Sequence, residues 1–170
     1  MKKEENFLEE FKRALSSTIK SISQKKECEI KFGSSEIATA KDVNLPEIKK
    51  IKNLEDIINI RAIADSEALR LKHSNQEVFN LYKPSGKIAE KLYKISEKIR
   101  YEKIGCDDFK GIEKNISIVF NDLKKKSELK KNVKKNNKNS LIEEKFDSYL
   151  RNLFFNIDNK KKHSDLKKTK

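Results

Sequence analysis

Two polar clusters combine arginines with carboxylates at spacings that suit a helix. They lie within residues 61–73 and 97–105, and their members are Arg61, Asp65, Arg70, His73, Glu97, Arg100 and Glu102. Residues three or four apart are neighbours on a helix, so Arg61 can touch Asp65. A planar guanidinium can bind a carboxylate through two parallel hydrogen bonds, which an ammonium cannot do. The clusters predict either a lattice of Arg–carboxylate contacts that fixes one helix against another, or a surface that docks a partner.

Arginine is scarce in this chain, which makes its positions informative. Five arginines stand against 35 lysines, and three of the five (Arg61, Arg70 and Arg100) fall in the two clusters. Lys, Asn and Ile have A/T-rich codons, so a biased genome can raise lysine usage without selecting a basic binding surface. An arginine that is kept under such a bias indicates a geometric need for its forked donors.

Other patterns that carry chemistry are missing from the sequence. The four glycines form neither GxxxxGK nor GxGxxG, so ATP binding is not expected. Cys28 and Cys106 have no CxxC spacing, which argues against a zinc site and a disulfide framework. His73 and His163 lie far apart, which leaves little for a Ser/His/Asp or Cys/His catalytic set. We expect no catalytic, cofactor-binding or metal-ligating residue in this chain.

The positive charge is concentrated at the C-terminal end. The chain has 40 Lys+Arg and 27 Asp+Glu, a net charge of +13. Residues 1–123 carry 24 basic and 21 acidic residues, whereas residues 124–170 carry 16 and 6. No apolar run approaches the ~20 residues of a membrane span, and the charged start does not resemble a secretory signal. We therefore expect a cytoplasmic protein that does not contact a membrane.

Apolar spacing predicts a mainly α fold of five to six helices with one short β element near residues 28–40. Cys28, Ile30 and Phe32 alternate with charged residues and precede Gly33, which predicts a strand whose partner lies near residues 36–40. The longer helical patterns cover residues 5–23, 54–73, 86–105 and 107–123, with a short segment around 78–82.

The expected helix ends follow from local signals. Asn53 suits an N-cap for residues 54–73. Gly105 stands where a helix C′ glycine would stand, and Asp107 can cap the next helix.

These patterns divide the chain into four parts. Residues 1–123 form an α-rich domain, and residues 124–139 read as a basic Lys/Asn linker. A capping box at residues 140–143 opens a loosely attached amphipathic helix over 140–158, and residues 159–170 are expected to be a disordered tail.

The chain contains an ordered series of short motifs: FKRA (11–14), EIKF (29–32), LPE (45–47), AD with ALRL and H (64–73), ExxRxExxG (97–105) and GI with NI (111–116). Together these motifs resemble the CobT-type subunit of the aerobic, ATP-dependent cobaltochelatase. They keep their order over about residues 7–120, and the resemblance identifies this part as the family's N-terminal region. The linker is basic where the family's is acidic, and no DxSxS motif of the family's von Willebrand factor A domain occurs. The sequence fits either a piece of a longer or split gene or a protein without that half.

The resemblance implies a non-catalytic accessory subunit in cobalamin biosynthesis. In the family, a large subunit holds the corrinoid, and an AAA+ subunit hydrolyses ATP to drive Co(II) into hydrogenobyrinic acid a,c-diamide. The CobT-type subunit docks with the ATPase, so ATP, Mg²⁺ and cobalt are expected on the partner subunits. The two polar clusters are then candidates for structural or partner-docking residues.

Two other classes of protein stay open from sequence. A small helical nucleic-acid-binding protein would use the basic tail on phosphates, with affinity that falls steeply as salt rises. Against it, no aromatic-rich strand, GXXG loop or arginine-bearing recognition helix occurs, so nucleic-acid binding would be nonspecific. An autonomous enzyme is the least favoured class, because no catalytic set is found.

Overall fold

The protein is mainly helical, with a short two-stranded parallel sheet, as the sequence predicts. The computed structural model describes residues 2–33, 41–129 and 138–155. Its elements are α1 (Lys2–Ser23), β1 (Ile30–Phe32), β2 (Val43–Leu45), α2 (Leu54–His73), α3 (Gln76–Leu81), α4 (Lys87–Asp108), α5 (Lys110–Leu129) and α6 (Lys138–Phe155). Across these described ranges, none of the helices combines the length and apolarity needed to span a membrane.

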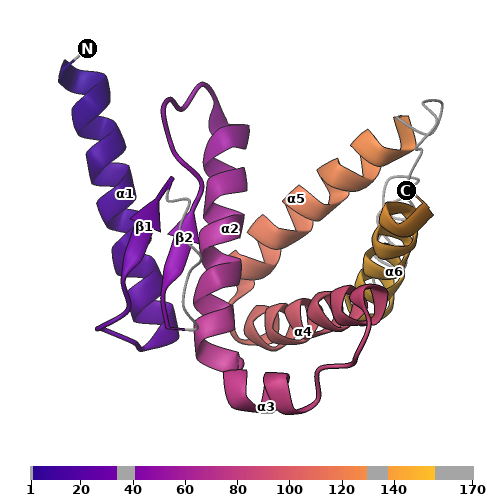
Figure 1. Ribbon diagram of the computed structural model, residues 1–170. Coiled ribbons are helices and arrows are strands. Elements are labelled where there is room, and N and C mark those ends of the chain that lie inside the picture. The colour runs from indigo at the N-terminus through magenta and orange to yellow at the C-terminus, as the bar shows by residue number, and fades with distance from the viewer. Residues whose placement is uncertain (1, 34–40, 130–137, 156–170) are drawn as a thin grey trace, which may run out of the picture.

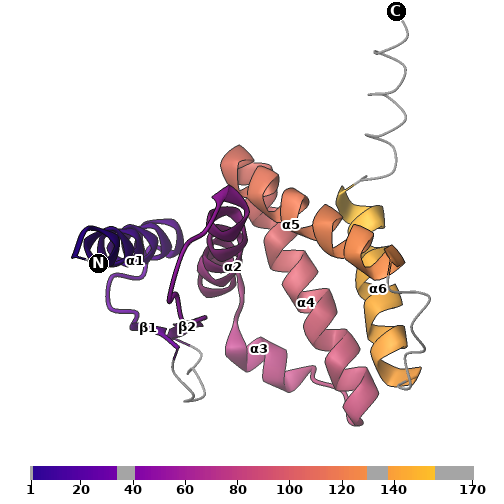
Figure 2. The same ribbon diagram turned by 90° about the horizontal axis from the view of Figure 1, so that it is seen from above.

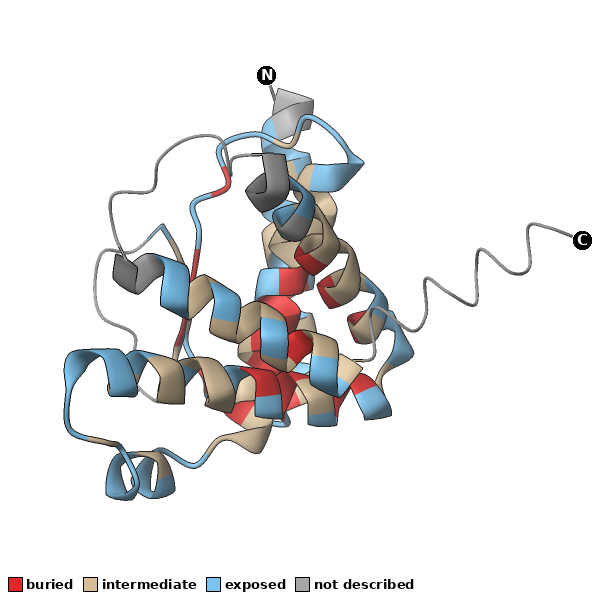
Figure 3. Cartoon of the chain, turned by 90° about the vertical axis from the view of Figure 1, so that its right-hand side faces the viewer, coloured by how far each residue is buried: buried red, intermediate tan, exposed pale blue. Residues whose placement is uncertain are grey.

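Helix α2 stands at the centre of the molecule and is buried on two sides (Figure 1). Toward α1 and the strands, Ala64 and Ala68 join a core that includes Leu15 and Ile19 of α1. Toward α4 and α5, Leu69 joins a second core. Seen from above, α1 and the strands lie on one side of α2, and α4, α5 and α6 lie on the other (Figure 2). The buried residues accordingly gather where the helices pack together (Figure 3).

The strand pair corrects one expectation. β1 pairs in parallel with β2, with Ile30 opposite Val43 and Phe32 opposite Leu45. The partner strand therefore lies at residues 43–45, further along the chain than expected; residues 36–40 lie outside the described part. Alternation of two or three residues locates a strand but carries little information about which segment pairs with it.

The start of α2 confirms its predicted cap. Asn53 has an extended backbone, and its side-chain oxygen accepts a hydrogen bond of 2.9 Å from the Asp56 amide. This contact satisfies one of the amides that a helix leaves without a partner in its first turn. A second Asn cap, at Asn75, accepts from the amides of Glu77 and Val78 and opens α3.

The predicted helix end at Gly105 is wrong. Helix α4 continues to Asp108, and Gly105 is buried inside it against Leu69 of α2. A Cβ at this position would lie 2.8 Å from Leu69 Cγ and closer still to both Leu69 methyl carbons. The glycine is thus explained by the close approach of α4 to α2. Asp107 also belongs to α4, where it pairs with Lys103, and the next helix begins at Lys110.

The boundaries near the C-terminal end also differ from expectation. Helix α5 runs to Leu129, so residues 124–129 of the expected linker are helical. Helix α6 begins at Lys138, so Ser140 lies two residues inside the helix and not before its first residue. Residues 138–139 of the expected linker belong to α6, while its residues 130–137 and the expected disordered tail (159–170) lie outside the described residues.

Candidate functional site

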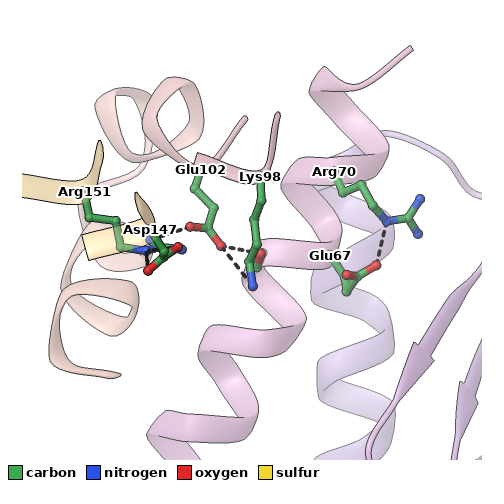
Figure 4. A network of polar contacts seen from close by, with 7 residues as sticks. Glu67, Arg70, Lys98, Glu102, Asp147 and Arg151 are labelled. Atoms are coloured by element: carbon green, nitrogen blue, oxygen red, sulfur yellow. Dashed lines mark hydrogen bonds and ion pairs between the residues drawn. The ribbon is translucent and has the colours of Figure 1, made fainter. Parts of the chain in front are cut away.

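Glu102 of α4 is the most enclosed carboxylate of the two sequence clusters after Asp65. Its side chain is 3% exposed, yet both oxygens have partners. Ser66 Oγ of α2 donates to one oxygen at 2.6 Å, and Arg151 Nη1 of α6 donates to the other at 2.7 Å. In Figure 4, Glu102 lies between Arg151 and Lys98. Lys98 Nζ is 3.9 Å from the Glu102 oxygen that accepts from Ser66. One carboxylate therefore connects three helices.

Arg151 brings a buried positive charge to this point from α6. Its side chain is 9% exposed, and its Nε also donates to the Asp147 carboxylate at 3.1 Å. The guanidinium stacks over the Phe120 ring of α5, 5.4 Å from the ring centroid. Burial by itself would lower the pKa of Arg151, but the charges and hydrogen bonds of Glu102 and Asp147 outweigh it and raise the pKa. The guanidinium stays charged and is committed to its two carboxylates.

Arg61 and Asp65 form the intrahelical pair that the sequence predicts. Arg61 Nε donates to Asp65 Oδ1 at 3.0 Å, and the Asp65 side chain is completely buried. The second oxygen of Asp65 accepts from Asn115 Nδ2 at 2.9 Å. Since Asn115 belongs to α5, this carboxylate joins α2 to α5 in the way that Glu102 joins α4 to α6.

Arg70 connects α2 to the strand region. It pairs with Glu67 at 2.7 Å within the helix, and its Nη2 donates to the Asp42 carbonyl oxygen at 2.6 Å. Asp42 directly precedes β2, and its side chain accepts from the Glu29 amide next to β1. The arginine thereby ties the central helix to the start of both strands.

Arg100 provides the forked contact that the sequence analysis inferred from the use of arginine. Its Nε and Nη2 donate to the two oxygens of Glu97 at 2.7 and 2.8 Å. Nη2 also donates to the His73 carbonyl at the end of α2, 2.6 Å away, and Ser74 Oγ donates to Glu97 at 2.7 Å. The hydrogen bond from Arg100, helped by that from Ser74, outweighs burial and lowers the pKa of Glu97. The pair thus holds the C-terminal end of α2, where helix carbonyls lack intrahelical donors.

The His73 side chain is partly buried at the C-terminal end of α2. Its Nε2 is buried without a hydrogen-bond partner. Burial, with the positive charges of Lys72 and Arg100, lowers its pKa against the opposing effect of Asp108. Within the described residues, no three His, Cys, Asp or Glu side chains come together as a group that could hold a metal ion.

The predicted lattice exists in a different form. The pairs Arg61–Asp65, Arg70–Glu67 and Arg100–Glu97 each lie within one helix. The residues of the two clusters are joined to other helices by hydroxyls, a side-chain amide, a carbonyl and one distant arginine, namely Ser66, Ser74, Asn115, His73 and Arg151. Arg151 and its partner Asp147 were not predicted from the sequence. The available signal was arginine scarcity, because Arg151 is one of only five arginines.

Two cavities flank Lys98 on the surface of this network. The first, of about 290 Å³, lies among α2, α4, α5 and α6. The second, of about 310 Å³, lies among α2, α3 and α4. Lys98 lines both of them, so its side chain marks the place where they adjoin.

The fold and the polar network define a mainly helical protein whose helices are joined through shared carboxylates. The comparison with protein families identifies it further: residues 5–154 match the family model described as cobalamin biosynthesis protein CobT. The chain belongs to this family, and the match covers α1 to α6 except for the residues at the two ends. No solved structure matches the chain.

Proposed function

We propose that this protein is a non-catalytic accessory subunit of a cobaltochelatase, which docks with the AAA+ ATPase subunit. Membership in the CobT family assigns the chain to cobalamin biosynthesis. The finer proposal is that the complex inserts Co(II) into hydrogenobyrinic acid a,c-diamide, with the corrinoid on a large subunit. The observation that carries the proposal is the family match over residues 5–154.

The state of the polar groups supports an accessory role. Glu102, Asp65 and Glu97 each accept hydrogen bonds from an arginine and from a second donor, so their oxygens are used in contacts within the fold. Burial, with the nearby Glu102 charge, raises the pKa of Tyr101 and raises that of Cys106 to about 12. Both groups therefore stay protonated and are weak nucleophiles at neutral pH.

The sizes of the cavities support placing the chemistry on other subunits. Each lies at the lower end of the roughly 300–1,000 Å³ that enclose small-molecule ligands. A corrin macrocycle with its carboxylate side chains is larger than either of these cavities. We place ATP, Mg²⁺ and cobalt on the partner subunits because the resemblance to the family implies that the ATPase and the large subunit hold them.

Co-purification with the AAA+ subunit encoded in the same genome tests the proposal. The tagged protein should retain the ATPase at micromolar concentrations, with both proteins folded by circular dichroism. A mixture that separates into its two components at these concentrations would refute the docking.

A further inference from the structure

Helix α6 is held to the rest of the fold by fewer buried side chains than the other long helices. Figure 2 shows it at the edge of the molecule, beyond α4 as seen from α2. Arg151 is the only buried residue among the described side chains of α6. Each of the other long helices buries apolar side chains, for example Ile19 in α1, Leu69 in α2, Ile99 in α4 and Ile112 in α5. Because burial of apolar surface is the main favourable term in packing, α6 gains less from it than they do.

Several large apolar side chains of α6 contribute little to its attachment, because they face the solvent. Tyr149, Leu153 and Phe154 are 63%, 57% and 48% exposed. Phe155 is partly buried and packs against the second core. It therefore provides an apolar contact that its exposed neighbours do not.

The ion pairs that link α6 to α4 also add little free energy. Docking removes both Arg151 and Glu102 from water, and this desolvation cancels much of the attraction between them. The pair Lys91–Glu143 is 2.7 Å long, but Lys91 is exposed, and exposed ion pairs contribute little to stability. Neither pair makes the docked position strongly favourable.

The interface under α6 contains unfilled space. The cavity of about 290 Å³ among α2, α4, α5 and α6 is lined by Asp147 and Arg151 of α6 and by apolar side chains that include Ile116 and Val119 of α5. Side chains that border a cavity lack the dispersion contacts of a close-packed interface. Undocking of α6 therefore gives up fewer contacts than undocking of a fully packed helix.

We propose that α6 is a lid that opens as a unit while the other helices stay folded. In the closed state, its Arg151 fills a site formed by the Glu102 carboxylate of α4 and the Phe120 ring of α5. Opening exposes both groups to water and empties this guanidinium site. Elements with few buried apolar contacts are the ones that open at free energies below that of global unfolding.

Hydrogen exchange of the full chain tests the lid. Once α6 leaves α4, a single helix of this length is only marginally stable in water, so its amides exchange. We expect the amides of residues 138–155 to exchange at least 100-fold faster than the most protected amides of α2, with similar protection along the central turns of α6. Equal protection of α6 and α2 would show that α6 opens only with global unfolding and would overturn the proposal. A steady rise in protection from the ends of α6 to its middle would indicate fraying and would overturn it as well.

Two neighbouring substitutions provide a matched pair. Phe155→Ala removes the ring that packs on the second core, whereas Phe154→Ala removes the same side chain from an exposed position. Phe155→Ala should speed exchange of residues 138–155 at least fivefold and leave α2 within twofold of wild type, and Phe154→Ala should leave both helices within twofold. If the two variants behave alike, or if Phe155→Ala speeds exchange in α6 and α2 by the same factor, α6 is not a separate lid.

An arginine-specific protease gives a second measurement on the full chain. The Arg151 side chain is 9% exposed, against 24% for Arg70, 38% for Arg61 and 45% for Arg100. Burial in the closed structure would make Arg151 the last of these four to be cut. Opening of the lid makes it the first, because cleavage within a helix requires local unfolding. Cleavage at Arg61, Arg70 or Arg100 before Arg151, followed by mass spectrometry, would contradict the proposal.

Discussion

Replacing Arg151 by Met tests the contact that joins α6 to the rest of the protein. The substitution keeps an unbranched apolar stem but leaves the Glu102 carboxylate, 3% exposed, with Ser66 as its close partner. Removing one member of a buried ion pair typically costs about 3–5 kcal/mol, because the remaining charge is buried without compensation. Asp147 is 32% exposed and can be rehydrated, so its loss of Arg151 adds little.

The expected loss corresponds to a fall in Tm of roughly 6–20 °C, given about 2–4 °C per kcal/mol for a chain of this size. Helix α6 can also respond by detaching, which exposes Glu102 to water and limits the loss to the free energy of docking α6. Urea unfolding therefore measures the global loss, and hydrogen exchange of residues 138–155 measures detachment. Arg13→Met is the control, because Arg13 is exposed on α1 and the change should stay within about 0.5 kcal/mol.

Two further results separate a buried charge from lost packing. The double variant Glu102→Leu/Arg151→Met should recover most of the stability lost in Arg151→Met, since an apolar pair of similar volume can replace a buried ion pair. The deficit of Arg151→Met should also be smaller in acid than at pH 8, because the unpaired carboxylate is destabilising only while charged. If Arg151→Met unfolds within 0.5 kcal/mol of wild type and residues 138–155 keep their protection, the reasoning about this contact is wrong.

The remaining predictions concern helix packing, the arginine fork and a buried thiol. Gly105→Ala should lower the free energy of unfolding, measured in urea, by about 1–3 kcal/mol, because its Cβ overlaps buried Leu69. Gly111→Ala is the control: a Cβ there meets open space, so the free energy of unfolding should be unchanged or rise by up to about 1 kcal/mol. Equal effects of the two substitutions would contradict the close approach of α4 and α2. Arg100→Lys keeps the charge but loses the two parallel hydrogen bonds to Glu97, so Tm should fall by an amount equivalent to about 0.5–1.5 kcal/mol. An unchanged Tm together with unchanged partner binding would show that this forked contact is unnecessary. Burial and nearby carboxylates raise the pKa of Cys106 to about 12, above its value in the unfolded chain, so the contribution of this thiol to stability is complete below about pH 8.5 and is lost toward pH 12. Alkylation of Cys106 at pH 8 should therefore be as slow as global unfolding. Rapid labelling of the folded protein would show that the site is open.

The features that depend on neighbours in sequence could be predicted from the residues alone. The helical range of α2 and its cap at Asn53 follow from apolar spacing and from one side chain that reaches three residues along the chain. The Arg61–Asp65 pair is of the same kind, since its members are four residues apart on one helix.

The features that depend on distant residues could not be predicted in this way. Gly105 has the local sequence of a helix end, and only the position of Leu69 on another helix shows why glycine is needed inside α4. The contact of Arg151 with Glu102 spans 49 positions in the sequence, so local spacing contains no information about it. Asn115 likewise reaches Asp65 from a separate helix. Residue types therefore indicated that carboxylates would be bound, while the partners that join the helices became evident only in three dimensions.

The proposed accessory role is tested most directly by cobalt insertion with purified components. The assay combines the AAA+ subunit, the large subunit, ATP, Mg²⁺, Co(II) and hydrogenobyrinic acid a,c-diamide, with this protein present or omitted. We expect insertion only when this protein is present, and none when it is the only protein in the reaction. Insertion that proceeds equally well in its absence, or that this protein performs by itself, would contradict the account.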